Sequence, residues 1–282
     1  GTYSTDALGT ALKTPINSAY GLTSASFDNP FRDIRNKDNI VAKRGALFMI
    51  DLLNEVQARG FTVAHIKTDS IKIPNATPEI IKFVMDFGKT YGYTFEHEST
   101  YEKMCLVNNA VYIAKYANKE KCKKLYSYIP KENIKHENEW TATGAQFQVP
   151  YVFKKLFSKE PIEFSDLCET KSVMSCMYLN MNTDISNEQV KPEDMQFIGR
   201  VGSFCPMKPG YGGYLLREGT NKKTLEKTYA FVNGTKGYYW LESDMVKDLN
   251  KEEYIDRSLY DRLVNEAVDA ISKYGDYEQF VD

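Results

Sequence analysis

Apolar residues recur every three or four positions in several separate segments of the chain, which is the spacing of one helical face. This pattern predicts helices over residues 1–20, 40–59, a stretch that begins at 78, 146–157 and 257–273. Pro15 is expected to kink or interrupt the first helix, and Gly21 and Gly60 are expected to end the first two. For the second helix, the predicted buried residues are Ala46, Leu47, Ile50, Leu53 and Val56.

Short β-rich runs between residues 61 and 116 predict strands. They cover Phe61–Ile66, Ile71–Ile73, Tyr93–Glu98, Lys103–Asn108 and Val111–Tyr116. The polar segment K-T-D-S at 67–70 separates the first two runs, so it predicts a hairpin with an acid at its tip. Thr77 followed by Pro78 is a good start for the next helix, whose predicted buried residues are Ile80, Ile81, Val84 and Phe87.

The order helix, hairpin, helix, strands predicts an α+β fold, with an antiparallel palm-like sheet backed by helices, rather than a doubly wound sheet. Phe27–Asn39 and the acidic, Asn-rich stretch after residue 157 are expected to be loops. Ala117–Glu139 is basic and poor in apolar residues, which is typical of a linker. Phe197–Trp240 is rich in glycine and aromatic residues and predicts a small β module.

Composition narrows the class of protein. Hydrophobic residues make up 42% of the 282 residues and charged residues 26%, which excludes a disordered tail, a collagen-like fibre and a disulfide-built miniprotein. No apolar run is long enough to span a membrane, and the first residues lack the features of a signal peptide. Five cysteines without a C-x-x-C pair predict free thiols in a reducing compartment, and three scattered histidines argue against a zinc site. We therefore expect a soluble, cytoplasmic protein.

The charge total conceals an uneven distribution. Thirty-six basic and 38 acidic residues give a net charge of −2, yet residues 101–159 carry 11 lysines against 5 glutamates. Residues 237–282 carry 5 basic against 12 acidic side chains. A basic stretch of this kind suits a polyanion such as nucleic acid, although a solvated lysine face is an equally good interpretation of the charge alone.

Two segments carry the candidate chemistry. Lys13, Asn17 and Tyr20 differ by four and three positions, so on a helix they lie along one face and present an ammonium, an amide and a phenol. Asp69 lies in the turn between apolar strands, where a rigid scaffold fixes its carboxylate as a divalent-metal ligand requires. Taken singly, Asp69 is an ordinary turn residue and Lys13 an ordinary exposed lysine, and only the pair favours a shared site.

These residues resemble a known family. K-T-P-I-N-S-A-Y-G-L at 13–22 is similar to motif B, K-x-x-x-N-S-x-Y-G, of family B (α-like) DNA polymerases. K-T-D-S, about 50 residues later, is similar to the D-T-D-S turn of motif C. The resemblance covers 7–116, and W-T-A-T-G-A-Q-F-Q-V-P-Y-V-F-K-K-L-F from residue 140 resembles, less specifically, the C-terminal part of phage-encoded members.

The resemblance implies three regions: a remnant of the fingers helix at 1–22, a palm at 23–127, and a mixed helical and β thumb-like region that grips DNA at 128–282. The implied activity is template-directed DNA synthesis in phage DNA replication, in the cytoplasm of the host cell. The implied partners are primer–template DNA and dNTPs, and the implied cofactor is a pair of Mg²⁺ ions. The basic stretch 101–159 would follow the duplex backbone.

The resemblance also assigns roles to residues. Lys13 would contact the triphosphate of the incoming nucleotide, and Asn17 and Tyr20, with Gly21 beside them, would line the pocket of the nascent base pair. Asp69 would be one of the two carboxylates that hold the metal ions. Tyr112 falls where the family has the tyrosine of its K-x-Y primer-strand motif.

The sequence departs from the family at four points. Lys67 replaces the first acid of D-T-D-S, and Ala110 replaces the lysine of K-x-Y, so that the primer contact would be weaker or would be supplied by Lys103 or Lys115. No D-x-x-S-L-Y-P segment, the motif A that provides the other metal acid, occurs in the 282 residues, and the exonuclease acids have no counterpart. A separate chain or an upstream region would have to supply both.

Two other interpretations stay open. The chain is also consistent with a non-catalytic DNA-binding subunit or fragment, or with one half of a split polymerase that is active only with a partner carrying motif A. The tyrosines and Trp240 of the β module are consistent either with stacking on bases or with simple packing.

Overall fold

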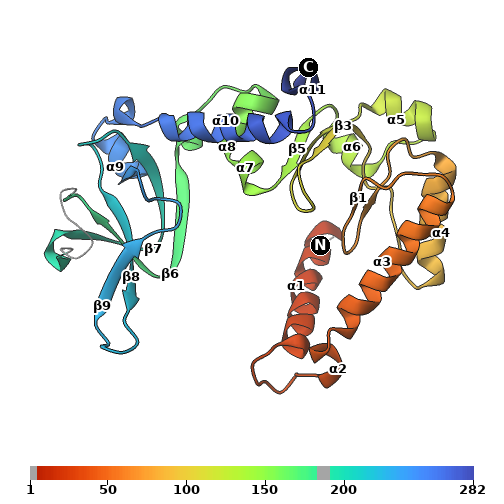
Figure 1. The fold of residues 1–282 in the computed structure, drawn as a ribbon, viewed down its shortest axis with the longest axis horizontal. Coiled ribbons are helices and arrows are strands. Elements are labelled where there is room, and N and C mark those ends of the chain that lie inside the picture. Colours follow the sequence, from red (N-terminus) through yellow and green to blue (C-terminus); the bar gives the residue numbers. More distant parts are fainter. Residues whose placement is uncertain (1–4, 183–190) are drawn as a thin grey trace. The chain divides into compact units, whose positions relative to one another are not determined.

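The computed structural model describes residues 5–182 and 191–282 as an α+β fold with antiparallel sheets (Figure 1). The chain forms two compact units. The first comprises 1–102 and 116–138, and the second comprises 103–115 and 139–282. The α+β class is the one that the order of sequence patterns predicts.

The first unit is mainly helical. Its elements are α1 (Thr5–Ser24), α2 (Ile34–Lys37), α3 (Ile40–Ala58), β1 (His65–Ile66), β2 (Ile71–Lys72), α4 (Pro78–Thr90), α5 (Lys119–Tyr126) and α6 (Lys131–Lys135). Thr77 caps α4 by accepting a hydrogen bond from the Ile80 backbone N–H, and Pro78 occupies the first turn, as predicted. Gly60 follows α3 with φ of +84°, a conformation that favours glycine and ends the helix as expected.

The core of the first unit lies between α3 and α4. It consists of Phe48, Met49, Leu52, Val56, Ile80 and Val84. The helix 40–59 is therefore confirmed, but its predicted buried face is largely wrong, because Leu47 and Ile50 are 64% and 51% exposed. Apolar residues surround this helix on several sides, so periodicity alone could not choose between the faces.

α1 corrects two further expectations. The helix continues through Pro15 and past Gly21 to Ser24, so neither residue ends it. The hydroxyls of Thr23 and Ser24 donate to the backbone oxygen of Tyr20, which satisfies a carbonyl group of the last turn. The expected loop 27–39 contains the short helix α2, capped by the Asp33 side chain.

The segment 117–139, expected to be a linker, instead forms α5 and α6 and packs within the first unit. Cys122 and Tyr126 of α5 are buried, and the Tyr126 hydroxyl donates to the Ala76 backbone oxygen at 3.2 Å. Asn133 of α6 is fully buried and hydrogen-bonded to the backbone groups of Thr100 and Ala117, which precede it in the sequence. Hydrogen bonds from side chains to the backbone thus help to hold this segment against the first unit. Such bonds leave no periodic apolar pattern in the sequence, so the pattern did not predict the two helices.

The second unit contains most of the strands. Its elements are β3 (Tyr101–Leu106), β4 (Tyr112–Tyr116), β5 (Trp140–Thr143), α7 (Ala145–Gln148), α8 (Pro150–Phe153), η1 (Lys154–Ser158), η2 (Phe164–Leu167), β6 (Glu169–Asn180), η4 (Pro192–Asp194), β7 (Met195–Met207), β8 (Tyr214–Thr220), β9 (Lys227–Phe231), β10 (Tyr239–Glu242), α9 (Ser243–Asp248), η5 (Glu252–Tyr254), α10 (Ser258–Ser272) and α11 (Tyr277–Val281). The ends of β3 and β4, at 101–102 and 116, belong to the first unit.

Two sheets organise the second unit. β3, β4 and β5 form a three-stranded sheet in that order, which confirms two of the predicted strands, whereas 93–98 has no strand. β10-β7-β6-β8-β9 forms a curled, antiparallel half-barrel sheet (Figure 1). The β module predicted at 197–240 is thus confirmed, but β6, the strand that pairs with both β7 and β8, was expected to be loop.

Two hydrophobic cores support these sheets. One face of the half-barrel, including Met177, Leu179 and Leu215, packs with Tyr151 of α8 and Tyr260 of α10. The other core joins the three-stranded sheet to α8, η1 and the second half of α10. The helix predicted at 257–273 is confirmed as α10, whereas the helix predicted at 146–157 is divided into α7, α8 and the π-helical η1.

All five cysteines are free thiols, as predicted. Within 5–182 and 191–282, no helix has the length and apolar composition that crossing a bilayer requires.

Candidate functional site

The predicted hairpin around Asp69 is present and is held to the first core by its apolar strands. β1 and β2 pair antiparallel, with Ile66 opposite Ile71. Both side chains pack against the cluster of α3 and α4. The backbone N–H of Lys67 donates to the Ser70 backbone oxygen at 2.8 Å, so Thr68 and Asp69 occupy the two central positions of the turn. Both are exposed, and the Asp69 carboxylate is therefore presented to solvent from a fixed base.

Lysines flank this carboxylate. Burial, and then the positive charge of Lys67, hold the pKa of Lys72 below its usual value. The carboxylates of Glu98 and Asp69 act on this pKa in the opposite direction. The Lys72 ammonium thus lies within electrostatic range of Lys67 and Asp69 of the hairpin and of Glu98 outside it. A cation at Asp69 would be repelled by Lys67.

The side chains available as metal ligands decide whether this chain alone could hold the implied pair of Mg²⁺ ions. Among the residues that the structure describes, no three His, Cys, Asp or Glu side chains gather as a metal ion would require. Magnesium is held by carboxylate and phosphate oxygens, and Asp69 provides one such group. These residues alone therefore do not fit a two-metal site, and Asp69 fits only as one ligand of a site that is completed from elsewhere.

α1 presents the motif B residues on its surface. Lys13, Asn17 and Tyr20 are all exposed, Tyr20 by 41%, and their spacing of four and three positions places them on one stripe. The side chains of Lys13 and Asn17 form no hydrogen bond or ion pair with the residues that the structure describes. Gly21 lies in the same helix, and a Cβ added to it would meet nothing within 4 Å. The stripe is thus accessible to a ligand.

The residues of the two motifs share the first unit, but no direct bond joins them. α1 and the Asp69 hairpin both belong to that unit. Within the described part of the chain, no ion pair or hydrogen bond links Lys13, Asn17 or Tyr20 to Asp69. The structure therefore places both motifs on exposed positions without assembling them into one pocket.

The residues assigned to the primer lie on the three-stranded sheet. Lys115 is opposite Trp140 in the pairing of β4 with β5, and its ammonium lies 5.6 Å from the centroid of the Trp140 ring. Tyr112 is three positions away, so its side chain points to the opposite face of the strand. Lys103 and Cys105 differ by two positions, so Lys103 points to the face that contributes Cys105 to the core. Tyr112 and the two lysines therefore do not share one surface of this sheet.

The basic stretch 101–159 is divided between the two units. Part of its charge is neutralised locally, because Lys119 pairs with Glu137 at 3.2 Å and Lys121 pairs with Glu102 at 3.5 Å. Lys123 and Lys124 at the end of α5 are exposed and form no ion pair with the described residues. The lysines of this stretch thus belong to two units, and in the first unit only some of them are free of a carboxylate partner among the described residues.

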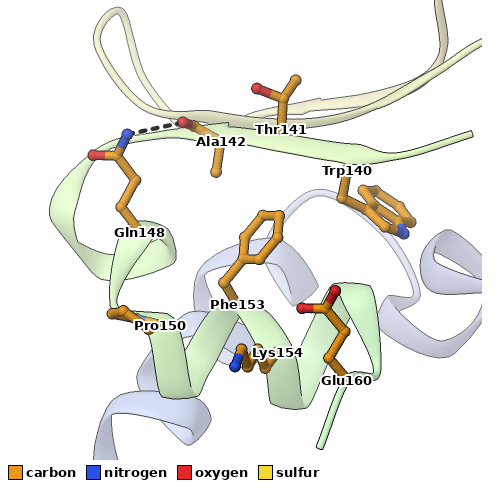
Figure 2. A pocket seen from close by; sticks show the side chains of 8 residues that line it. All are labelled: Trp140, Thr141, Ala142, Gln148, Pro150, Phe153, Lys154 and Glu160. Carbon is orange, nitrogen blue, oxygen red and sulfur yellow. Dashed lines mark hydrogen bonds between the residues drawn. The ribbon is translucent and has the colours of Figure 1, made fainter. Parts of the chain in front are cut away.

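Figure 2 shows an open hollow in the second unit, between β5 and the α8–η1 segment. Its lining residues are Trp140, Thr141, Ala142, Gln148, Pro150, Phe153, Lys154 and Glu160. The Gln148 amide donates to the Ala142 backbone oxygen at 3.1 Å, and Lys154 pairs with the buried Asp166 at 2.9 Å, which raises the pKa of Lys154. None of the predicted site residues lines the hollow, and its one lysine is already paired.

Sequence reasoning missed Lys72, which lies within electrostatic range of Asp69, and Glu98, which also acts on Lys72. Lys72 was visible as the polar residue between Ile71 and Ile73, and its position opposite His65 follows from the hairpin register. Glu98 lies at the end of a segment predicted to be a strand that has none. His65 of β1 is buried, with 5% of its surface exposed.

A scan against models of known protein families finds no match for the sequence, and a search among curated proteins finds none either.

Proposed function

We propose that this chain takes part in template-directed DNA synthesis, the nucleotidyl transfer from dNTPs to a primer 3′ end, as the C-terminal part of a phage-type family B DNA polymerase. One observation carries the proposal. The exposed stripe Lys13, Asn17 and Tyr20 lies in the same compact unit as an exposed aspartate on a rigid hairpin tip. These are the residue types, in the order along the chain, that the resemblance assigns to the nucleotide and the metal.

The residues of the chain would act by binding and positioning. The Lys13 ammonium would neutralise negative charge on the triphosphate, an interaction that gains strength as the phosphoryl group is transferred. The Tyr20 ring and the Asn17 amide would contact the flat face and the polar edge of the new base pair. Asp69 would contribute one carboxylate, and the second acid would come from a separate chain or an upstream region that carries motif A.

Primer extension tests this proposal. The chain is assayed with primer–template, dNTPs and Mg²⁺, alone and together with a protein that carries a D-x-x-S-L-Y-P segment. We expect extension only in the mixture, and we expect Asp69→Asn to reduce it by about 100-fold or more, because a metal ligand contributes several kcal/mol to transition-state stabilisation. Duplex binding, measured by fluorescence anisotropy, should stay unchanged.

Asp51→Asn is the matched control, since Asp51 is exposed on α3 of the same unit. An equal loss of duplex binding and extension in Asp69→Asn would mean that Asp69 is structural. Extension by the chain alone would contradict the need for an external acid.

A second function, a DNA-binding subunit without catalysis, is favoured by Lys67. This lysine lies where a catalytic hairpin of the family has an acid, and its charge opposes a cation at Asp69. The same assays separate the two functions, because this subunit would bind duplex DNA yet give no extension with any partner. Lys67→Asp sharpens the test: it should raise extension if the hairpin is catalytic and should only weaken DNA binding if it is not.

A further inference from the structure

The half-barrel carries a row of aromatic residues on one face. Phe197 of β7 lies opposite Tyr178 of β6, Tyr178 lies opposite Leu216 of β8, and Leu216 lies opposite Phe231 of β9. Residues opposite each other on antiparallel strands share a face of the sheet. Tyr214 and Tyr229 lie two positions from Leu216 and Phe231, so they belong to this face as well. We call Tyr178, Phe197, Tyr214, Tyr229 and Phe231 the aromatic face.

The rings of the aromatic face contact one another, and Tyr214 also stacks on Tyr239, which packs at the edge of the core. Tyr178 lies between Phe197 and Tyr229, with ring centroids 5.6 and 5.7 Å apart, and Tyr214 contacts Phe231 at 5.5 Å. Leu216 beneath them is 2% exposed, whereas Phe197 is 62% exposed. In the described part of the chain, none of the five rings belongs to a hydrophobic core cluster, because the core uses the opposite face of these strands.

The same strands are basic. Residues 195–236 contain seven lysines and arginines against two glutamates, a net charge of +5 in a chain whose total is −2. Lys227 lies two positions from Tyr229 and is therefore on the aromatic face. It pairs with Glu218 at 3.0 Å, and Glu218 also accepts a hydrogen bond from the Tyr178 hydroxyl at 3.1 Å.

The turn between β8 and β9 adds two more positive charges. Lys222 and Lys223 are exposed and form no ion pair with any residue within the described ranges. Phe197 is exposed and the other four rings are half-buried, so each keeps part of its surface accessible near lysines that carry unpaired charge. This combination suits a ligand that offers both flat apolar surfaces and negative charge. Single-stranded nucleic acid has this combination, because its unpaired bases expose their faces beside the phosphates. A duplex hides the faces of its bases, and an acidic peptide lacks regularly spaced planar rings.

We propose that the aromatic face binds single-stranded nucleic acid, with bases stacked on Phe197 and Tyr229 and phosphates near Lys222, Lys223 and Lys227. The ring network keeps the side chains ordered before binding, which limits the entropic cost of stacking. The site lies in the second unit, away from Asp69 in the sequence, and it does not rest on the proposed polymerase activity.

Anisotropy of a labelled dT oligonucleotide of about 12 nucleotides tests the proposal on the full chain. We expect Phe197→Ala and Tyr229→Ala each to weaken binding roughly tenfold, because loss of one base–aromatic stack has about this effect. Phe31→Ala is the matched control, since Phe31 is 65% exposed in the first unit. The double variant Lys222→Gln/Lys223→Gln should reduce the slope of log affinity against log salt by about 1.

Photo-crosslinking with 5-iodouracil in the same oligonucleotide locates the contact, and we expect crosslinks within 178–231. Circular dichroism verifies that each variant is folded. Failure of the wild-type chain to bind the oligonucleotide at low salt overturns the proposal, as do crosslinks confined to the first unit. Unchanged affinity in both ring variants also overturns it. Asp51→Asn should bind the oligonucleotide as the wild type does. A chain that gives no primer extension with any partner can still bind the oligonucleotide, so the two assays fail independently.

Discussion

The two units of this protein differ in how their apolar residues are used. The first unit buries a core of six residues between α3 and α4, and it leaves Leu8, Leu12 and Ile16 of α1 more than half exposed. The second unit buries fifteen residues in the half-barrel core alone. The resemblance to a polymerase lies mainly in the sparsely packed unit, whereas the well-packed unit carries no motif of comparable specificity.

This difference separates residues whose presence is explained by packing from residues whose presence is not. The motif residues Lys13, Asn17 and Asp69 are exposed, so the packing of the first unit does not explain their presence. In the half-barrel, glycine and aromatic residues are explained first by the fold: a Cβ at Gly213 would collide with the Asn180 backbone, and Trp240 is fully buried. Only the rings that the core leaves unused, such as Phe197, need a functional explanation.

The largest expected effect is on the core of the half-barrel. Trp240 is fully buried, and its indole N–H donates to the Thr235 backbone oxygen at 2.9 Å. We expect Trp240→Ala to reduce the free energy of unfolding by about 4 kcal/mol, since it removes a large buried side chain and leaves a cavity. Urea unfolding monitored by the fluorescence of Trp140, the other tryptophan of the same unit, measures the change.

Val201→Ala serves as the control, because Val201 of β7 is 62% exposed and should contribute less than about 0.5 kcal/mol. A loss below about 1 kcal/mol in Trp240→Ala would show that the half-barrel is not the more firmly packed of the two units.

A smaller effect is expected at Asn133 in the first unit. Its side-chain amide donates to the Thr100 and Ala117 backbone oxygens, each at 2.8 Å, and its oxygen accepts from the Thr100 N–H at 2.8 Å. Asn133→Ala would remove the side-chain partner of the Thr100 N–H and of the Ala117 oxygen, and one of the two hydrogen bonds to the Thr100 oxygen, so we expect a loss of about 3 kcal/mol. Far-UV circular dichroism during urea unfolding should detect it, whereas tryptophan fluorescence, which reports on the second unit, should change little.

Asn54→Ala on the exposed side of α3 is the matched control, and it should leave stability unchanged or slightly higher because alanine favours helices. If Asn133→Ala behaves in the same way, the segment 117–139 is the loosely attached linker that its composition suggests.

The parts of the fold that could be predicted from sequence are those that local signals decide. The Asp69 hairpin, the Thr77 cap and α10 depend on turn residues, capping residues and periodicity within a few positions. The buried face of α3 could not be predicted, since apolar residues lie on several sides and the aromatic residues packed beside α4 select among them. β6 was missed because its pairing with β7 and β8 depends on residues far along the chain.

For the candidate site, the sequence was sufficient to predict the local position of single residues. It was not sufficient to predict which of them lie near one another. That Asp69 would be exposed at a turn follows from its neighbours. That Glu98 would act on the neighbouring Lys72 depends on the path of the chain after α4, which no local pattern specifies.

The smallest expected effect on stability, and the sharpest test of motif B, comes from one substitution made at two glycines. Gly21→Ala has room in α1 and should stabilise that helix by up to about 1 kcal/mol. Gly213→Ala has no such room and should destabilise the half-barrel by about 1–3 kcal/mol.

If Gly21 borders the base-pair pocket, the added methyl group should weaken binding of a fluorescent dNTP to the chain with primer–template by roughly tenfold. Such a loss cannot arise from unfolding, because the substitution favours the fold. Unchanged dNTP binding would mean that the similarity to motif B does not extend to a nucleotide at this end of α1, and that the exposed stripe of the first unit serves another ligand.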